Sequence, residues 1–139
     1  MNPDCFLDTN VLFYAAMGRF STPQKYRQAR QVMAETNFAV SGQVLQEFYV
    51  DVTKKSDKPL TSEQAIQWMN RLIDRPCAAI DHELVVRGAE IASRYKISYW
   101  DGSFVAGAER VRAPILCTED LNDGQFYGSV RVLNPFKTH

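Results

Sequence analysis

The chain alternates between short apolar runs and longer segments in which apolar side chains recur every three or four residues. The apolar runs do not alternate strictly with polar residues, which is typical of strands that are buried on both faces of a sheet. We therefore predict strands from the sequence at Cys5–Leu7, Phe38–Val40, Cys77–Ile80, Ile115–Cys117 and Val130–Leu133.

The longer segments have the spacing of amphipathic helices, each with one apolar face. Thr61 and Gln64 stand in the spacing of a capping box, and Asp81 is placed to cap the helix that follows it. The apolar face of the helix after Thr61 is expected to carry Ile66, Met69, Leu72 and Ile73. The predicted helices are Asn10–Met17, Pro23–Thr36, Gln43–Lys54, the segment after Thr61, the segment after Asp81 and Trp100–Val111.

Strands that alternate with helices favour an α/β protein with a parallel sheet covered by helices on both faces. We expect four to five strands in this sheet. The length of 139 residues is that of one ordinary domain, so we expect residues 1–139 to form a single domain. In such sheets ligands bind beyond the carboxyl ends of the strands, so candidate functional residues are sought there.

The composition is that of a globular protein, and the formal net charge is zero. Zero net charge argues against binding of nucleic acid through bulk charge, so any such contact has to come from local patches or a bound metal ion. The three cysteines, Cys5, Cys77 and Cys117, are interpreted as reduced core thiols of a cytoplasmic protein. The N-terminal residues 1–4 lack the features of a signal peptide, and no apolar run approaches the roughly 20 residues that span a membrane.

Four acidic residues lie at predicted strand ends or in the helices that follow them: Asp8, Glu47, Asp101 and Asp120. Each alone has a simple structural explanation. Asp8 and Asp101 could be helix caps, Glu47 a surface acid and Asp120 a turn residue. Asp101, however, begins the apolar stripe that continues through Phe104, where an acid is costly unless it has a partner.

If the four acids converge, their negative charges need a counter-ion. Two carboxylates about 5 Å apart repel by roughly 3 kcal/mol at an effective dielectric constant of about 20, and several such pairs do not all stay ionised. A ligand set made only of oxygen atoms selects Mg²⁺ or Mn²⁺ over zinc. The histidines, His82 and His139, stand outside any metal-ligand pattern, which argues against a softer metal.

In order and separation, these segments resemble the acidic motifs of PIN-domain nucleases, and in particular the VapC-type toxins. The resemblance runs from Phe6 to Phe136 and rests on residues 7–12 (Leu-Asp-Thr-Asn-Val-Leu), Glu47, Asp101 and residues 118–125, with residues 134–136 (Asn-Pro-Phe) closing the VapC-type ending. It implies a three-layer α/β/α sandwich around the parallel sheet, and cleavage of RNA that depends on Mg²⁺ or Mn²⁺. It also implies a VapB-type antitoxin as protein partner, and a homodimer.

The resemblance assigns roles to single residues. Asp8, Glu47 and Asp101 match the three central acids of the family, as catalytic residues and metal ligands. The polar residues that would orient the carboxylates are Thr9, Asn10 and Thr118.

The fourth acidic position of the family is less regular, and three residues compete for it. Asp120 is preferred because it keeps the spacing to Thr118, and it would share the catalytic and metal-binding role. Glu119 and Asp123 remain alternatives, and Asp123 followed by Gly124 equally fits a tight turn.

Three other functions remain to be weighed. A haloacid-dehalogenase-like phosphotransferase would need a second aspartate where Asn10 stands. An inactive PIN-like binding module is disfavoured by the presence of all four acidic positions. The sequence does not distinguish an RNA-processing PIN nuclease from a toxin, although the small size of the chain favours the toxin.

Candidate contacts to RNA are weaker, because ordinary solvated surface charge explains each basic group better than a specific contact does. We place neither Trp68 nor Trp100 in the site, and the helices around Tyr26 and Trp68 are candidates for a dimer or antitoxin surface. The basic groups are Lys25, Arg27 and Arg30 on one helix, and Lys54, Lys55 and Lys58 in one loop.

Overall fold

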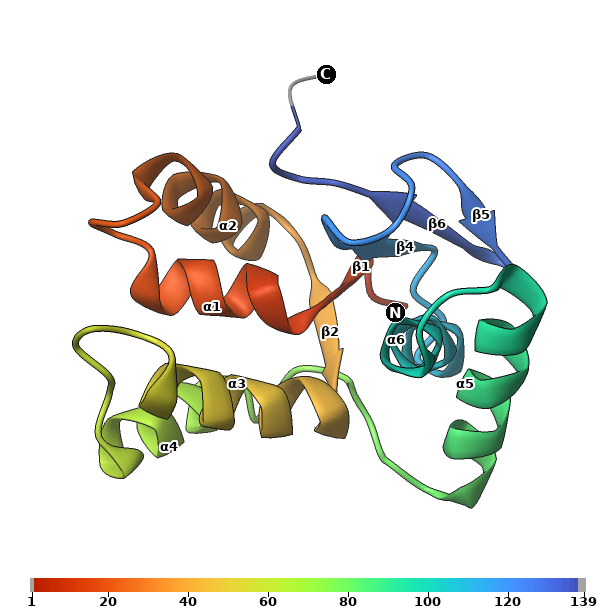
Figure 1. Cartoon of the computed structure of the whole chain (residues 1–139), viewed down its shortest axis with the longest axis horizontal. Helices are drawn as coiled ribbons and strands as arrows, with labels where there is room; N and C mark the ends of the chain where they lie inside the picture. Colours follow the sequence, from red (N-terminus) through yellow and green to blue (C-terminus); the bar gives the residue numbers. More distant parts are fainter. Residues whose placement is uncertain (1, 138–139) are drawn as a thin grey trace.

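The computed structural model describes residues 2–137 and is built around a mixed six-stranded sheet (Figure 1). The strands are β1 (Cys5–Leu7), β2 (Phe38–Ser41), β3 (Cys77–Ala78), β4 (Ile115–Cys117), β5 (Phe126–Tyr127) and β6 (Val130–Leu133). Their order is β3-β2-β1-β4-β6-β5, and all neighbours are parallel except β5, which runs antiparallel to β6. The central strand β1 is buried along its whole length, which explains its unbroken apolar sequence.

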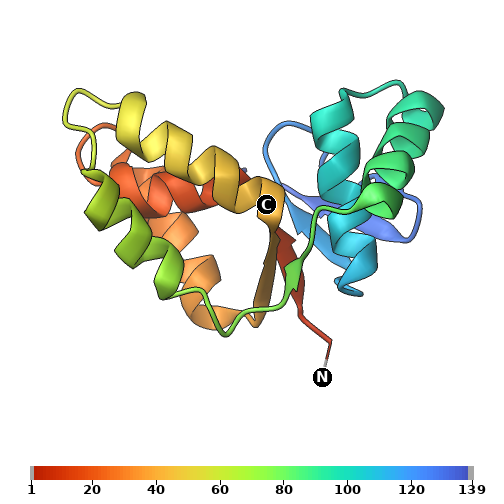
Figure 2. The ribbon, with the colours of Figure 1, turned by 90° about the horizontal axis from the view of Figure 1, so that it is seen from below.

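Helices cover both faces of the sheet, so the predicted three-layer α/β/α sandwich is confirmed. Helices α1 to α4 lie on one side, and α5 and α6 lie on the other (Figures 1 and 2). The helices are α1 (Thr9–Met17), α2 (Pro23–Glu35), α3 (Gly42–Lys54), α4 (Ser62–Asn70), α5 (His82–Tyr95) and α6 (Tyr99–Arg110).

Helix α6 is packed tightly between the sheet and α5. Residues 102–108 are all buried, and Phe104 packs against Phe6 of β1 with 6.3 Å between ring centroids. A Cβ atom on Gly102 would lie 2.5 Å from the backbone oxygen of Gly88 in α5. Only glycine allows the two helices to approach this closely, and their contact fixes the first turn of α6, which carries Asp101.

The local signals that set the helix ends are confirmed. Thr61 and Gln64 form the expected capping box at the start of α4. The side chain of Asp81 accepts a hydrogen bond from the backbone N–H of Leu84 and caps α5. Helix α6 begins one residue earlier than predicted and is capped by Ser98, so Asp101 is not its cap.

Two features of the sheet differ from the prediction. The sheet has six strands, where four to five were expected, because β5 is only two residues long and its apolar signal is too short to recognise. Strand β3 ends at Ala78 and does not continue to Ile80. It pairs only with β2 at the edge of the sheet, and its Cys77 is exposed, which corrects the prediction of three core thiols. Cys5 and Cys117 are buried as expected.

The apolar face predicted for α4 is wrong in part. Ile66 and Ile73 are exposed, whereas Ala65 and Leu72 are buried. Helix α4 ends at Asn70, so Ile73 lies beyond it and does not follow the helical spacing.

Among the described residues, no helix combines the length and the apolar character that crossing a bilayer requires. Met1 and His139, which entered the sequence-based predictions, lie outside the described residues.

Candidate active site

A pocket of about 550 Å³ opens between α3 and α6, where the segment after β4 also reaches. Three of the four predicted acids line it: Glu47 from α3, Asp101 from α6 and Asp120 from the segment after β4. Asp8, at the end of β1, is not on the wall of the pocket, but it is close enough to Asp120 and Glu119 for their charges to act on it. The fold therefore brings together acids that lie up to 112 positions apart in the chain.

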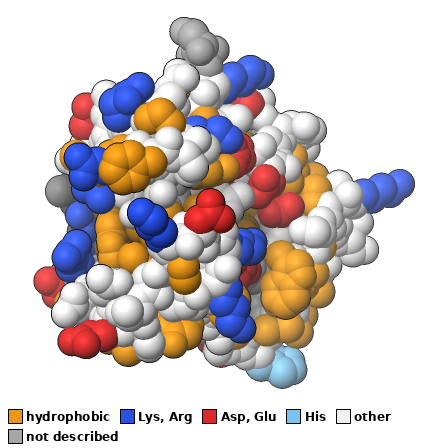
Figure 3. Space-filling model, turned by 60° about the vertical axis from the view of Figure 1, so that its left-hand side comes forward, with side chains coloured by type: hydrophobic (Ala, Val, Ile, Leu, Met, Phe, Trp, Pro, Cys, Tyr) orange, Lys and Arg blue, Asp and Glu red, His pale blue; other side chains and the backbone are white. Residues whose placement is uncertain are grey.

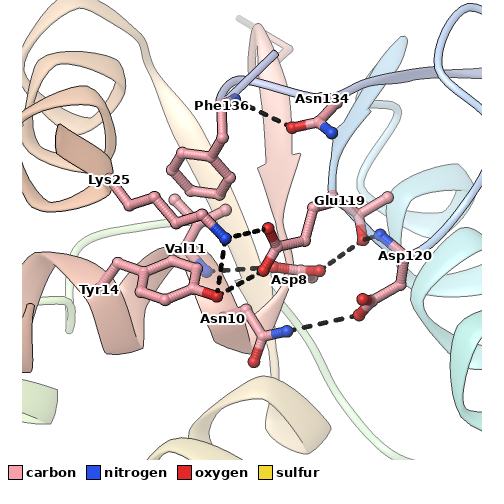
Figure 4. A network of polar contacts seen from close by, with 10 residues as sticks. Asp8, Asn10, Val11, Tyr14, Lys25, Glu119, Asp120, Asn134 and Phe136 are labelled. Atoms are coloured by element: carbon pink, nitrogen blue, oxygen red, sulfur yellow. Dashed lines mark hydrogen bonds and ion pairs between the residues drawn. The ribbon is translucent and has the colours of Figure 1, made fainter. Parts of the chain in front are cut away.

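Asp8 is buried, and each of its carboxylate oxygens accepts one hydrogen bond (Figure 4). One carboxylate oxygen accepts a bond from the backbone N–H of Val11 at 3.1 Å, so Asp8 caps α1, and the other accepts the hydroxyl of Thr118 at 2.5 Å. Burial raises the pKa of Asp8 to about 7, and the charges of Asp120 and Glu119 add to the rise, while the two hydrogen bonds oppose it. Asp8 therefore both caps α1 and lies among the acids, two roles that the sequence alone left as alternatives.

Asp101 lies in the first turn of α6, and its backbone N–H bonds the hydroxyl of Ser98. Partial burial raises the pKa of its carboxyl, and the charges of Asp120 and Glu47 raise it further. Asp101 is therefore held near two other carboxylates, with its negative charge incompletely compensated.

Glu47 is held from two directions. The hydroxyl of Thr9 donates to one carboxylate oxygen at 3.1 Å, and the side-chain amide of Gln43 donates to the other at 2.8 Å. Gln43 lies one helical turn before Glu47 on α3, a spacing that places the two side chains on one face. Sequence reasoning missed Gln43, although this spacing was a usable signal.

Asp120 is the exposed member of the group. The side chain of Asn10 approaches it at 3.4 Å, and its backbone N–H donates to the hydroxyl of Thr118 at 3.1 Å (Figure 4). Partial burial raises the pKa of its carboxyl, and so does the charge of Glu119 next to it.

The two alternatives for the fourth acid are engaged elsewhere. Glu119 accepts the hydroxyl of Tyr14 at 2.6 Å and pairs with Lys25 at 2.8 Å (Figure 4). Asp123 accepts the backbone N–H of Asn134 at 2.8 Å and lines a different pocket. The geometry thus favours Asp120 as the fourth acid of the candidate site.

The polar residues beside the acids bond across the site. Thr9, next to Asp8, bonds Glu47; Asn10 bonds Asp120; and Thr118 bonds Asp8. These contacts join segments that are 38 to 110 positions apart. Each one ties two acid-bearing segments together, which limits how far the carboxylates can move apart under their repulsion.

The donor set fits a hard divalent cation. Within residues 2–137, no three acidic, histidine or cysteine side chains are placed to ligate one ion together. Mg²⁺, however, is usually held by one or two carboxylates and keeps several of its waters. Burial, and then neighbouring acids, raise the pKa values of Asp8, Asp101 and Asp120, and such an ion would offset both effects.

Basic residues do not form one continuous surface on the face that Figure 3 presents, where Lys and Arg side chains are dispersed among apolar and acidic ones. Two of the candidate RNA contacts are paired with acids near the site, Lys25 with Glu119 and Lys55 with Asp51. Trp100, which the sequence interpretation left outside the site, lines the pocket together with the acids.

The chain is similar to a known family in sequence and to solved structures in fold. A model of the PIN domain family matches residues 5–126. A toxin–antitoxin complex from Klebsiella pneumoniae has a similar fold, with a TM-score of 0.71 and 21% identity over 96% of this chain and 99% of the other. No curated protein matches the sequence.

Two further solved structures are similar in fold. VapC20 from Mycobacterium tuberculosis, described as a sarcin–ricin loop cleaving toxin, has a TM-score of 0.66 and 14% identity over 84% of this chain and 91% of its own. VapBC2 from Rickettsia felis, bound to a fragment of its promoter DNA, has a TM-score of 0.61 and 19% identity over 92% and 96%.

The family match begins at the first residue of β1 and ends in β5, so it spans Asp8, Glu47, Asp101 and Asp120 together. It also sets aside the haloacid-dehalogenase-like alternative. The chain belongs to the PIN domain family.

Proposed function

We propose that this PIN-domain protein is a metal-dependent endoribonuclease that hydrolyses phosphodiester bonds in RNA. The observation that carries the proposal is the gathering of carboxylates from four separate segments at one end of the sheet. The pKa values of three of them, Asp8, Asp101 and Asp120, are raised by burial and by neighbouring acids. Such a site is unfavourable by itself and is stabilised by a divalent cation.

Asp8 and Asp101 are the proposed main ligands of Mg²⁺, for which Mn²⁺ can substitute, and Glu47 and Asp120 complete the site. A bound divalent ion polarises a phosphate oxygen and makes water a better nucleophile. Glu47 and Asp120 line the open pocket, so either is placed to accept a proton from the attacking water. The carboxylates are oriented by hydrogen bonds from Thr9, Asn10 and Thr118.

Removal of divalent metal is expected to abolish cleavage of a labelled single-stranded RNA. Protein stripped with EDTA should regain activity with Mg²⁺ or Mn²⁺ but not with Na⁺ at equal ionic strength, because the acids need a compact divalent charge. Gel analysis of the RNA measures the loss and the recovery. Cleavage at an unchanged rate by protein shown to be metal-free by elemental analysis would contradict the proposal.

We also propose that the chain is the toxin of a toxin–antitoxin pair, acting in the cytoplasm as a homodimer and blocked by a VapB-type antitoxin. Support comes from the similar folds of proteins described as toxins or as toxin–antitoxin complexes. RNA processing without toxicity is the alternative.

Induced expression in a bacterial host is expected to arrest growth, because a free endoribonuclease would deplete essential RNA. The Asp101→Asn variant, at the same protein level, should leave growth unchanged, and co-expression of a cognate antitoxin should restore growth to the wild-type strain. Growth curves with quantified protein levels provide the measurement. Normal growth with active wild-type enzyme present would favour RNA processing over toxicity.

A further inference from the structure

The pocket beside the acids has an aromatic wall that the proposed chemistry leaves unused. Trp100 lines the pocket with its side chain 62% exposed, whereas Phe104, which lines the same pocket, is 5% exposed. Tyr99 contacts the indole in a T-shaped arrangement, with 5.1 Å between ring centroids. Because this ring is both exposed and part of the pocket wall, it is a candidate contact surface for a ligand.

Gln43 links this aromatic wall to the acids. Its amide nitrogen donates to the carboxylate of Glu47 at 2.8 Å and to the backbone oxygen of Trp100 at 3.3 Å. Both partners are acceptors, so the orientation of the amide is determined. The Gln43 oxygen is buried without a hydrogen-bond partner in the described part of the chain. The amide nitrogen therefore connects Trp100 and Glu47 directly.

The position of Trp100 suits one kind of ligand. It lies directly before Asp101, and both residues line the same pocket. An RNA phosphate held near Asp101 therefore has its own base, or the next one, within reach of the indole. Nucleobases present flat apolar faces that stack on aromatic side chains whatever their sequence.

We propose that Trp100 is a base-stacking platform for single-stranded RNA, and that Gln43 is a positioning residue that fixes this platform relative to Glu47. The inference rests on the proposed ribonuclease function and names the part of the RNA that this pocket takes. It assigns Trp100 a role in substrate binding, separate from the cleavage step.

Binding is tested in saturating Mg²⁺ by stopped-flow tryptophan fluorescence, which records the binding step before cleavage proceeds. The chain has two tryptophans, so the Trp68→Phe variant makes Trp100 the only indole. A short unstructured RNA is expected to quench this emission to saturation. An abasic ribose–phosphate oligomer of equal length and charge is expected to leave the emission unchanged, because it has no base to stack. Equal quenching by both oligomers would overturn the proposal.

Substitutions of Trp100 give a second readout, the affinity for a fluorescently labelled RNA measured by anisotropy. Trp100→Ala is expected to weaken binding roughly 5- to 100-fold, the range for loss of one stacked base, whereas Trp100→Phe should retain most of the affinity. Phe20, whose side chain is 88% exposed and does not line the pocket, provides the matched control. Phe20→Ala should bind RNA as tightly as the wild type.

The outcomes separate this inference from the proposed function. Base-dependent quenching without cleavage under any metal would support the platform and contradict the nuclease. Normal cleavage together with unchanged RNA affinity of Trp100→Ala would overturn the platform and leave the nuclease standing. If Trp100→Ala binds RNA normally but loses a protein partner, the ring is a protein contact and the proposal is wrong.

Discussion

Cleavage of RNA by the Asp101→Asn variant is expected to fall by at least about 10³-fold in kcat/KM, equivalent to about 4 kcal/mol of transition-state stabilisation. Asparagine keeps the size of aspartate but removes the negative charge that a divalent ion needs. The effect should be large because Asp101 lies close enough to Glu47 and Asp120 for their charges to raise its pKa. Single-turnover kinetics with saturating Mg²⁺ would measure the chemical step.

A loss of activity is informative only if the fold is intact. Asp101→Asn should match the wild type in circular dichroism, because the cap of α6 is Ser98 and is not altered. Glu63→Gln in the first turn of α4 is a matched control that also removes one carboxylate, outside the pocket, and it should cleave normally. An Asp101→Asn variant that keeps more than a tenth of the activity would remove Asp101 from the proposed ligands.

The Asp8→Asn variant is expected to be more stable than the wild type when metal is absent and the pH is above 7. Asp8 is buried, and its pKa rises from 3.8 to about 7 in the folded protein. The shift of about three units corresponds to about 4 kcal/mol. Asparagine avoids this cost. Its oxygen can still accept from Val11, and its amide can donate to the Thr118 hydroxyl, which has two acceptor sites.

The sign of the effect defines the pH window. Between about pH 4 and pH 7 the folded wild type binds more protons at Asp8 than the unfolded chain does, so its stability falls as the pH rises. The advantage of Asp8→Asn is therefore small near pH 4 and reaches its full size above pH 7, as a rise in Tm of roughly 10 °C.

Thermal unfolding in EDTA at pH 4.5 and pH 8 measures this difference. The Glu63→Gln control should show no comparable gain at pH 8, since Glu63 lies outside the acid cluster. Saturating Mg²⁺ should raise the Tm of the wild type and reduce the advantage of the variant, because an ion that binds only the folded state stabilises it. A lower Tm for Asp8→Asn than for the wild type in EDTA at pH 8 would show that Asp8 is not strained by its charge.

Much of the fold follows from local sequence. The runs at Ile115–Cys117 and Val130–Leu133 are strands with the predicted bounds. Ile115–Cys117 is an unbroken apolar run, and Val130–Leu133 alternates buried and exposed residues, so both carry a local strand signal. The caps at Thr61 and Asp81 are equally local, since each bonds a backbone N–H three residues on.

The sequence prediction fails where contacts with distant parts of the chain determine the local structure. Strand β5 exists because β6 offers it an antiparallel edge, and its two residues carry no period of their own. Cys77 is exposed because β3 pairs only with β2 at the edge of the sheet. Ile73 follows the end of α4, so its helical spacing in the sequence has no counterpart in the structure.

The candidate site, like the fold, can be predicted from the sequence only in part. The acids themselves are visible in the sequence because they interrupt apolar patterns at strand ends and helix starts. Their partners are not: Thr9 bonds Glu47 rather than the neighbouring Asp8, and this depends on how α1 packs against α3. Trp100 was set aside because nothing local shows that the residue before Asp101 faces the same pocket as Glu47.

The start of α1 carries one of the four acids and contacts two others within three consecutive residues. Asp8 is itself an acid and caps the helix, Thr9 reaches Glu47 and Asn10 reaches Asp120. Asp8 and Thr9 are buried at the carboxyl end of the central strand, so this turn cannot open without disrupting the core. The assembled site is therefore expected to persist until the domain unfolds as a whole.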